Sequence, residues 1–222
     1  MNKQEKSTSL AAMRTRKVLV EAGLELFGSQ GFEATSTRQI AQLARTNIAS
    51  IAYHFGGKDG LREACAHYVG RTLGRVAMRR HSNGGSLETM SAEQARLIML
   101  SLVDQMVAFT QLQHKASLIV PFILNEANRP NGTLPLLYEE LFGPVLENIT
   151  QVWAKATNTS PESEFVRLQL FAVIGPIIYF RIARNIVTKR MEWQSIGPDE
   201  AAKIAAVIKQ NLIALLDASV KE

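Results

Sequence analysis

The sequence predicts an all-α fold of about nine helices. Three observations predict it. Apolar residues recur at spacings of three and four along most of the chain. Residues that favour helix ends punctuate these segments at intervals typical of helices. No alternating run of β-branched residues bounded by turn residues is present, so the sequence gives no indication of strands.

The first helix is expected at Met13–Gln30, after a polar and frayed tail at residues 1–12. Its apolar stripe includes Leu19 and Phe27. Gly31 lies where helices commonly end in a left-handed residue, and Phe32 can then fold back onto the stripe.

Two short helices joined by a tight turn are expected next. The first spans residues 34–44 and is capped by Thr35 or Ser36. Arg45 and Thr46 form the turn, and Asn47 caps the second helix, at residues 48–55. Two short helices braced by a longer one form a helix-turn-helix arrangement, here at residues 13–57.

A larger helical domain is expected at residues 58–222. Its first helix spans residues 58–80, and the loop Ser82–Ser86 is the clearest break in the chain. Ser91 and Gln94 form a predicted capping box. The further helices are expected at residues 91–111, 114–127 and 134–157, from about 158 to before Gly197, and from about Pro198 to the C-terminus.

The charge is distributed unevenly along the chain. Residues 1–81 hold thirteen Lys or Arg against six Asp or Glu, whereas residues 82–222 hold twelve against fourteen. The first third therefore carries +7 and the remainder −2. A basic segment of this kind suits a polyanionic partner, although basic helix faces that are merely solvated would give the same count.

The second short helix is expected to expose small or flat polar side chains that fit a DNA major groove about 12 Å wide. This predicted base-reading set is Thr46, Asn47, Ala49, Ser50, Tyr53 and His54. Hydroxyls and cations of the kind that hold phosphates surround it. This predicted phosphate-binding set is Thr35, Ser36, Thr37, Arg38 and Lys58.

Three of these residues also have plain structural interpretations. Asn47 can be a helix cap and nothing more. Tyr53 can be a half-buried ring that packs on the first helix. His54 can be a solvated surface imidazole.

The N-terminal third resembles the TetR/AcrR family of bacterial transcription regulators, over about 45 residues and without a gap. The matching residues are Leu19, Ala22, Leu26, Phe27, Gly31, Phe32, Thr35, Ile40, Ala41, Ala44, Ile51, Tyr53, His54, Phe55, Lys58 and Leu61. One position departs from the family pattern, because Arg45 stands where the family usually has a turn glycine. Arg45 must tolerate the turn geometry at some energetic cost, and its cation can add a phosphate contact.

Two further segments resemble one subgroup of that family. They are residues 47–58 and the late segment Ile174–Arg181. The C-terminal domain of this subgroup was long catalogued as of unknown function, and one member is linked to sensitivity to certain antibiotics.

The resemblance implies that the two parts of the chain have different functions. The N-terminal helices bind an operator as part of a homodimer, and the C-terminal helices dimerise and enclose a small-molecule pocket. Ligand binding usually weakens DNA binding, so a repressor released by a small molecule is expected. We expect the ligand to act by shifting the helix at residues 58–80, which changes the separation of the two recognition helices.

Aromatic and Met side chains with a few polar groups are expected to line the pocket, although core packing is the stronger interpretation at most single positions. The pocket set is Met99, Met106, Phe109, His114, Phe122, Tyr138, Phe142, Trp153, Tyr179 and Arg181. The last two long helices are expected to dimerise. The interface set is Phe171, Ile174, Ile178, Ile204, Ile208, Leu212 and Leu215.

Two other classes of function compete with this interpretation. An enzyme is disfavoured because no recognised catalytic or metal-binding motif is present, so no catalytic residue, cofactor or metal is expected. A non-specific nucleic-acid or membrane-surface binder explains the basic first third equally well. Specific and non-specific DNA binders differ in their discrimination between operator and random duplex.

A cytoplasmic location is expected. The first twenty residues contain five basic residues and no continuous apolar stretch, unlike a secretory signal. The longest apolar run, Leu168–Phe180, is shorter than the roughly 20 residues of a membrane span. The single cysteine, Cys65, excludes an internal disulfide and suits a reducing compartment.

Overall fold

The computed structural model describes residues 3–78 and 87–219, and every regular element in these ranges is helical. The chain divides into two compact units. The first unit contains residues 1–74 and 117–142, and the second contains residues 75–116 and 143–222. The predicted loop at Ser82–Ser86 lies outside the described residues.

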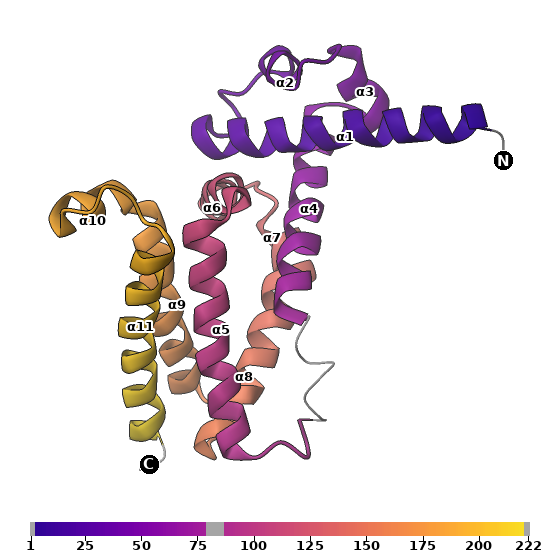
Figure 1. Ribbon diagram of the computed structural model, residues 1–222. Helices are drawn as coiled ribbons and strands as arrows, with labels where there is room; N and C mark the ends of the chain where they lie inside the picture. Colours follow the sequence, from indigo (N-terminus) through magenta and orange to yellow (C-terminus); the bar gives the residue numbers. More distant parts are fainter. Residues whose placement is uncertain (1–2, 79–86, 220–222) are drawn as a thin grey trace. The chain divides into compact units, whose positions relative to one another are not determined.

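The first unit begins with a three-helix head. Helix α1 spans Lys3–Gln30, α2 spans Thr37–Leu43 and α3 spans Ala49–Phe55, and both short helices pack on α1 (Figure 1). The frayed tail predicted at residues 1–12 is therefore wrong, since the helix begins ten residues before Met13. Residues 3–12 contain no Gly or Pro, so nothing in their composition ends the helix.

Helices that follow the head in sequence also belong to the first unit. They are most of α4 (Lys58–Met78), most of α6 (His114–Ala127), α7 (Leu134–Leu137) and the π-helical turn η2 (Tyr138–Phe142). The predicted domains at residues 13–57 and 58–222 separate the expected functions, whereas the units follow packing.

Helix α6 is fixed closely against the end of α1. A Cβ atom on Gly28 would lie 3.0 Å from the backbone nitrogen of Phe122, so only glycine lets the two helices approach this closely. The Asn125 side-chain amide donates a 2.6 Å hydrogen bond to the Gly28 carbonyl. The core of this unit includes the fully buried side chains of Phe27, Leu61 and Phe122.

The second unit is built around a helical bundle (Figure 1). Helix α5 (Ala92–Leu112) packs against α8 (Gly143–Thr157), α9 (Glu164–Ile182) and α11 (Pro198–Ser219). The fully buried Trp153 and Leu212 belong to its core. The predicted capping box at the start of α5 is confirmed, because the Ser91 and Gln94 side chains each bond the other's backbone N–H.

Two predicted helices are divided in the structure. The segment expected at residues 134–157 contains α7, η2 and α8 in succession. The segment expected to end before Gly197 contains α9 and, after a break at Ala183, the short helix α10 (Arg184–Met191). No Gly or Pro lies between Ile177 and Met191, so the sequence pattern carried no signal for this break.

The predicted dimer face is partly wrong. Ile204, Ile208 and Leu212 on α11 are buried in the core of their own unit, and Leu215 packs against that core. Their helical spacing reflects packing inside the chain. On α9, by contrast, Phe171 is 57% exposed, whereas Ile174 and Ile178 are half-buried.

By length and composition, α5 and α9 are apolar enough to cross a membrane, which is weak evidence for a span. Core helices of other proteins pass the same test. Only 28% of the apolar window of α9 is buried, against 39% for α5. The exposed apolar surface of α9 therefore needs its own explanation.

Candidate nucleic-acid interface

Helix α2 is oriented by its capping residues. Ser36 is the N-cap, and its hydroxyl oxygen accepts a hydrogen bond from the Gln39 N–H while the Gln39 side chain accepts one from the Ser36 N–H. Thr35 lies just before it and is only 1% exposed. Its hydroxyl is directed to the Gly31 and Leu26 carbonyls, at 2.7 and 3.2 Å.

Thr35 is therefore an internal anchor, and its inclusion in the phosphate-binding set is wrong. Its hydroxyl ties the start of α2 to the end of α1, where Gly31 adopts the predicted left-handed conformation with φ of 79°. Ser36 and Arg38 are exposed and Thr37 is half-buried, so these three remain accessible from solvent.

The turn between α2 and α3 is strained at one residue. Arg45 has φ of 51°, in the left-handed region that a turn glycine adopts without cost. The Thr46 N–H then bonds the Ala41 carbonyl at 3.0 Å, which closes the turn. Arg45 is exposed and stands beside the base-reading set.

The start of α3 presents short polar side chains. The Asn47 side-chain oxygen accepts a 2.9 Å hydrogen bond from the Ala49 N–H and so holds the first turn of the helix, but the N-cap position is Ile48, one residue after the predicted cap. Thr46 and Ser50 hold their hydroxyls 3.5 Å apart. Asn47 and Ala49 are exposed, and Thr46 and Ser50 are half-buried.

Tyr53 is the most exposed large hydrophobic side chain in the described part of the chain, at 83%. A half-buried ring that packs on α1 is therefore excluded. His54 is half-buried, its ring meets Tyr53 edge-on at 4.9 Å, and its carbonyl accepts a 3.0 Å hydrogen bond from the Arg16 guanidinium. The same guanidinium lies 4.6 Å from the centroid of the Phe55 ring, so this one side chain of α1 contacts α3 at both His54 and Phe55.

Three cations surround Phe32, a cluster that sequence reasoning did not identify. Lys58, Arg62 and Arg129 lie 4.1, 4.2 and 5.6 Å from the ring centroid. Arg129 also bonds Glu33 at 3.1 Å. Lys58 and Arg62 lie on α4 and Arg129 follows α6, so the packing of both helices in the first unit brings the cluster together. The cluster fixes Lys58 at the edge of the head.

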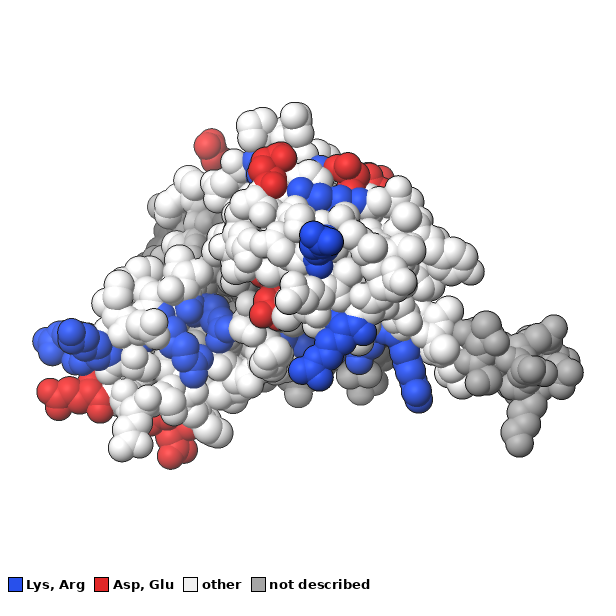
Figure 2. Space-filling model, turned by 90° about the horizontal axis from the view of Figure 1, so that it is seen from above, with Lys and Arg blue, Asp and Glu red and all other residues white. Residues whose placement is uncertain are grey.

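Figure 2 shows the face that carries α2 and α3 in Figure 1. Most of the surface in this view is uncharged, both basic and acidic side chains project from it, and on the head Arg38 and Arg45 are exposed. Phosphate groups are held by such cations, whereas base edges are read by uncharged polar groups. The head therefore has the two kinds of surface that a DNA-reading domain uses.

The ten residues of the predicted pocket do not gather in one place. Met99, Phe109 and Trp153 are buried in the second unit, whereas Phe122 is buried in the first. Tyr138 and His114 are exposed, and Met106, Phe142 and Arg181 are half-buried. Burial and the nearby Arg184 lower the pKa of Arg181.

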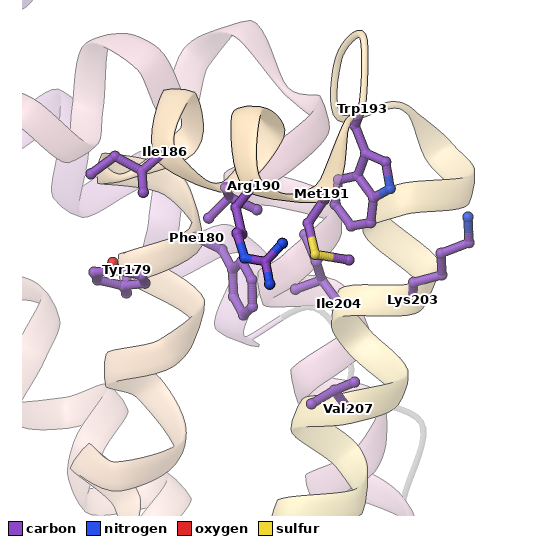
Figure 3. A pocket seen from close by; sticks show the side chains of 10 residues that line it. Tyr179, Phe180, Ile186, Arg190, Met191, Trp193, Lys203, Ile204 and Val207 are labelled. Atoms are coloured by element: carbon purple, nitrogen blue, oxygen red, sulfur yellow. The ribbon is translucent and has the colours of Figure 1, made fainter.

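Of this set, Tyr179 lines a pocket between α9, α10 and α11 (Figure 3). Sequence reasoning missed the rest of its wall, because α10 was not recognised as a separate helix. The sequence signals that could have indicated this pocket are Trp193 and the cations Arg190 and Lys203, which lie close to Gly197 and Pro198 in the sequence.

The described residues offer little for catalysis. No group of three His, Cys, Asp or Glu residues suited to a metal is found among them. The Cys65 thiol is fully buried, and burial together with the negative charge of Glu126 raises its pKa. A thiol with a raised pKa is a poor nucleophile.

Two family comparisons match two separate parts of the chain. Residues 19–65 match the bacterial regulatory proteins of the TetR family. Residues 95–219, more than half of the chain, match the C-terminal domain of the HTH-type transcriptional dual regulator CecR.

Similar proteins agree with these matches. The HTH-type transcriptional dual regulator CecR of Shigella flexneri is 28% identical over 197 residues, which cover 86% of each chain. A TetR-like transcriptional regulator from Rhodococcus sp. RHA1 has a similar fold, with a TM-score of 0.60 at 18% identity over 90% of this chain and 96% of the other. A gamma-butyrolactone receptor described as ArpA-like gives a TM-score of 0.58 at 17% identity, over 90% and 98% of the two chains.

Proposed function

Because the chain belongs to the TetR family of bacterial transcriptional regulators and carries a CecR-type C-terminal domain, we propose that it is a homodimeric repressor released from its operator by a small molecule. It is a DNA-binding regulator that acts on transcription, in a family of regulators rather than of enzymes. We place it in the cytoplasm, where operator DNA is accessible.

The exposed surface of α3 is the observation that carries the DNA-binding part of the proposal. Tyr53 extends into solvent, and Asn47 and Ala49 flank it with small groups. A helix that buries only Ile51 completely and leaves such groups outside is suited to a major groove. In the proposal, the base-reading set contacts base edges, and Ser36, Thr37, Arg38 and Lys58 contact phosphates.

An apolar stripe on α9 supports the homodimer. It consists of Phe165, Leu168, Phe171, Tyr179 and Ile182, which are 52–59% exposed and recur at helical spacing. A row of this kind on one face of a helix marks a protein interface. In a twofold dimer the same patch meets itself, so one stripe supplies both sides of the contact. We propose this α9 stripe, including Phe171, in place of the buried α11 residues.

Activation at some promoters is a second candidate outcome. The Shigella flexneri relative is described as a dual regulator, and it covers most of this chain. The same head can repress or activate according to where its site lies relative to a promoter. Expression of the neighbouring genes in a deletion strain separates the two outcomes, because loss of a repressor raises their transcription and loss of an activator lowers it.

Genome-wide mapping of bound DNA tests the proposal. A shared site with two half-sites about 34–36 Å apart, or at a multiple of that distance, is expected. The purified protein should bind this site roughly 10³–10⁷-fold more tightly than a scrambled duplex. Equal affinity for both would contradict sequence-specific regulation and favour the non-specific binder.

Replacement of Lys58 tests the phosphate contacts. Lys58→Ala should weaken binding to all duplexes alike and reduce the slope of log affinity against log salt by about 1. Lys155→Ala, which removes an exposed cation from α8, is the matched control and should leave the slope unchanged. An unchanged slope in Lys58→Ala would assign Lys58 solely to the Phe32 cluster.

A further inference from the structure

We infer that the pocket between α9, α10 and α11 binds an amphipathic organic anion, an apolar body that ends in a carboxylate or a similar group. The inference rests on the proposed function, because it names the class of small molecule that would release the repressor. It also assigns a site that differs from the set expected from the sequence.

The pocket is large enough for a small molecule, with a volume of about 350 Å³. Its walls come from the last turns of α9, from α10 and from the start of α11, as Figure 3 shows. Val187 and Ile204 are buried and belong to its floor, and Trp193 forms one side. Nearly all of this surface is apolar, so the body of the ligand is apolar as well.

Hydrogen bonds to the backbone hold the pocket in shape. The Arg184 guanidinium donates to the Gln111 carbonyl at 3.1 Å and to the Ile196 carbonyl at 2.8 Å, which ties the first turn of α10 to the chain on both sides. The Trp193 N–H bonds the Thr188 carbonyl at 2.9 Å and directs the chain back from α10. A pocket held in this way loses little freedom when a ligand enters.

The charges around the pocket are positive. Arg190 and Lys203 line it, and no acidic residue does. Within the described ranges, Arg190 makes no ion pair, and Figure 3 shows its guanidinium directed across the pocket. Lys203 lies 5.8 Å from the Trp193 ring centroid.

A carboxylate in the first turn of α11 is already used elsewhere. Glu200 accepts a 2.9 Å hydrogen bond from the Gly197 N–H, and this bond lowers its pKa. Lys203 contributes to the same shift, so part of its charge is balanced by Glu200. Arg190 is therefore the cation that remains for a ligand, and its planar guanidinium suits a carboxylate.

The location explains how such a ligand could act. Tyr179 belongs both to the pocket and to the α9 stripe. A molecule seated beside Tyr179 changes the end of the proposed dimer face. Since the two heads must match half-sites at a fixed separation, a small shift of that face lowers operator affinity.

Octanoate and 1-octanol are suitable probes because they share a chain and differ in charge. Octanoate should change the emission of Trp193 saturably and bind about tenfold more tightly than 1-octanol, as expected for one exposed charge-assisted hydrogen bond. Arg190→Gln should abolish this preference and leave 1-octanol binding unchanged. Lys189→Gln is the matched control, since it removes a neighbouring cation that does not line the pocket.

The variant Trp193→Phe tests whether the change in emission comes from Trp193, since it should abolish the change. Trp153, the other tryptophan of the chain, is fully buried in the core and does not line the pocket. The inference is overturned if Trp193 does not respond, or if Arg190→Gln keeps the preference for octanoate. It is also overturned if Trp193 emission follows protein concentration and ignores octanoate, because a second copy then fills the pocket. If octanoate binds as expected but operator affinity does not change, the pocket stands and release by ligand fails.

Discussion

The head and α9 expose opposite kinds of surface. On the head, short helices bury Ile40 and Ile51 and leave Asn47, Tyr53 and a strained Arg45 outside. On α9, the exposed side carries large apolar groups such as Phe171. A polar, partly cationic surface suits nucleic acid, whereas an apolar row suits another protein surface. The comparison therefore supports the proposed contacts, DNA at the head and a second copy at α9.

The largest expected effect comes from breaking the α9 stripe. Phe171→Asp should convert the dimer to a monomer, because a carboxylate would be buried without a partner. Operator affinity should then fall by about 10²–10⁴-fold, since the second head loses its high effective concentration. Sedimentation and operator titration measure the two effects. Leu97→Asp, at an exposed leucine on α5, should change neither, and a similar loss there would remove the distinction.

The next effect tests whether α3 reads bases. Asn47→Ala should cost about 1–3 kcal/mol on the operator and relax the preference for one base. Asn47→Ser retains a short side-chain acceptor for the Ala49 N–H. Relative to Asn47→Ala, it should therefore recover more of the stability than of the base preference. If Asn47→Ala lowers the melting temperature and leaves the base preference intact, Asn47 is only a cap.

The strained turn gives a smaller effect with opposite signs on stability and binding. Arg45→Gly should raise the free energy of unfolding by about 1 kcal/mol, because glycine adopts a φ of 51° without strain. It should also weaken binding to all duplexes and reduce the salt slope by about 1 if Arg45 holds a phosphate. Arg45→Gln keeps the strain and should show only the binding loss. If the wild type, Arg45→Gly and Arg45→Gln bound DNA equally, Arg45 would strain the turn without contributing to DNA binding.

The smallest effect concerns the start of α11. The hydrogen bond from the Gly197 N–H lowers the pKa of Glu200 below its ordinary value of 4.5. The ionised carboxylate therefore stabilises the fold fully above that value, and this stabilisation is lost as pH falls through the lowered pKa. Glu200→Gln should melt slightly earlier than wild type at pH 7, and this difference should shrink as pH falls through the lowered pKa. A difference that does not depend on pH would assign the effect to lost packing.

The sequence predicted the head well because its signals are local. Capping at Ser36, the left-handed Gly31 and the exposed start of α3 each depend on a few neighbouring residues. The sequence did not indicate that Thr35 is buried, because its burial depends on packing against α1, where its hydroxyl reaches the Leu26 carbonyl. In the same way, periodicity placed Ile204 and Leu212 on one face of α11, but it does not distinguish a core from an interface.

The features that the sequence did not predict depend on distant contacts. The cations around Phe32 come from two separate parts of the first unit, Lys58 and Arg62 from α4 and Arg129 from the segment after α6. The pocket at Trp193 requires the break at Ala183, which Arg184 fixes through carbonyls on either side of α10 in the sequence. Neither contact leaves a local pattern, so both required the packed structure.

Footprinting of the purified protein on its mapped genomic site, with sedimentation of the same complex, tests the central claim most directly. The predicted result is a complex of two identical chains that protects two half-sites about 34–36 Å apart. A scrambled duplex should show no such protection. A single chain on one protected segment, or equal protection of scrambled DNA, would contradict it.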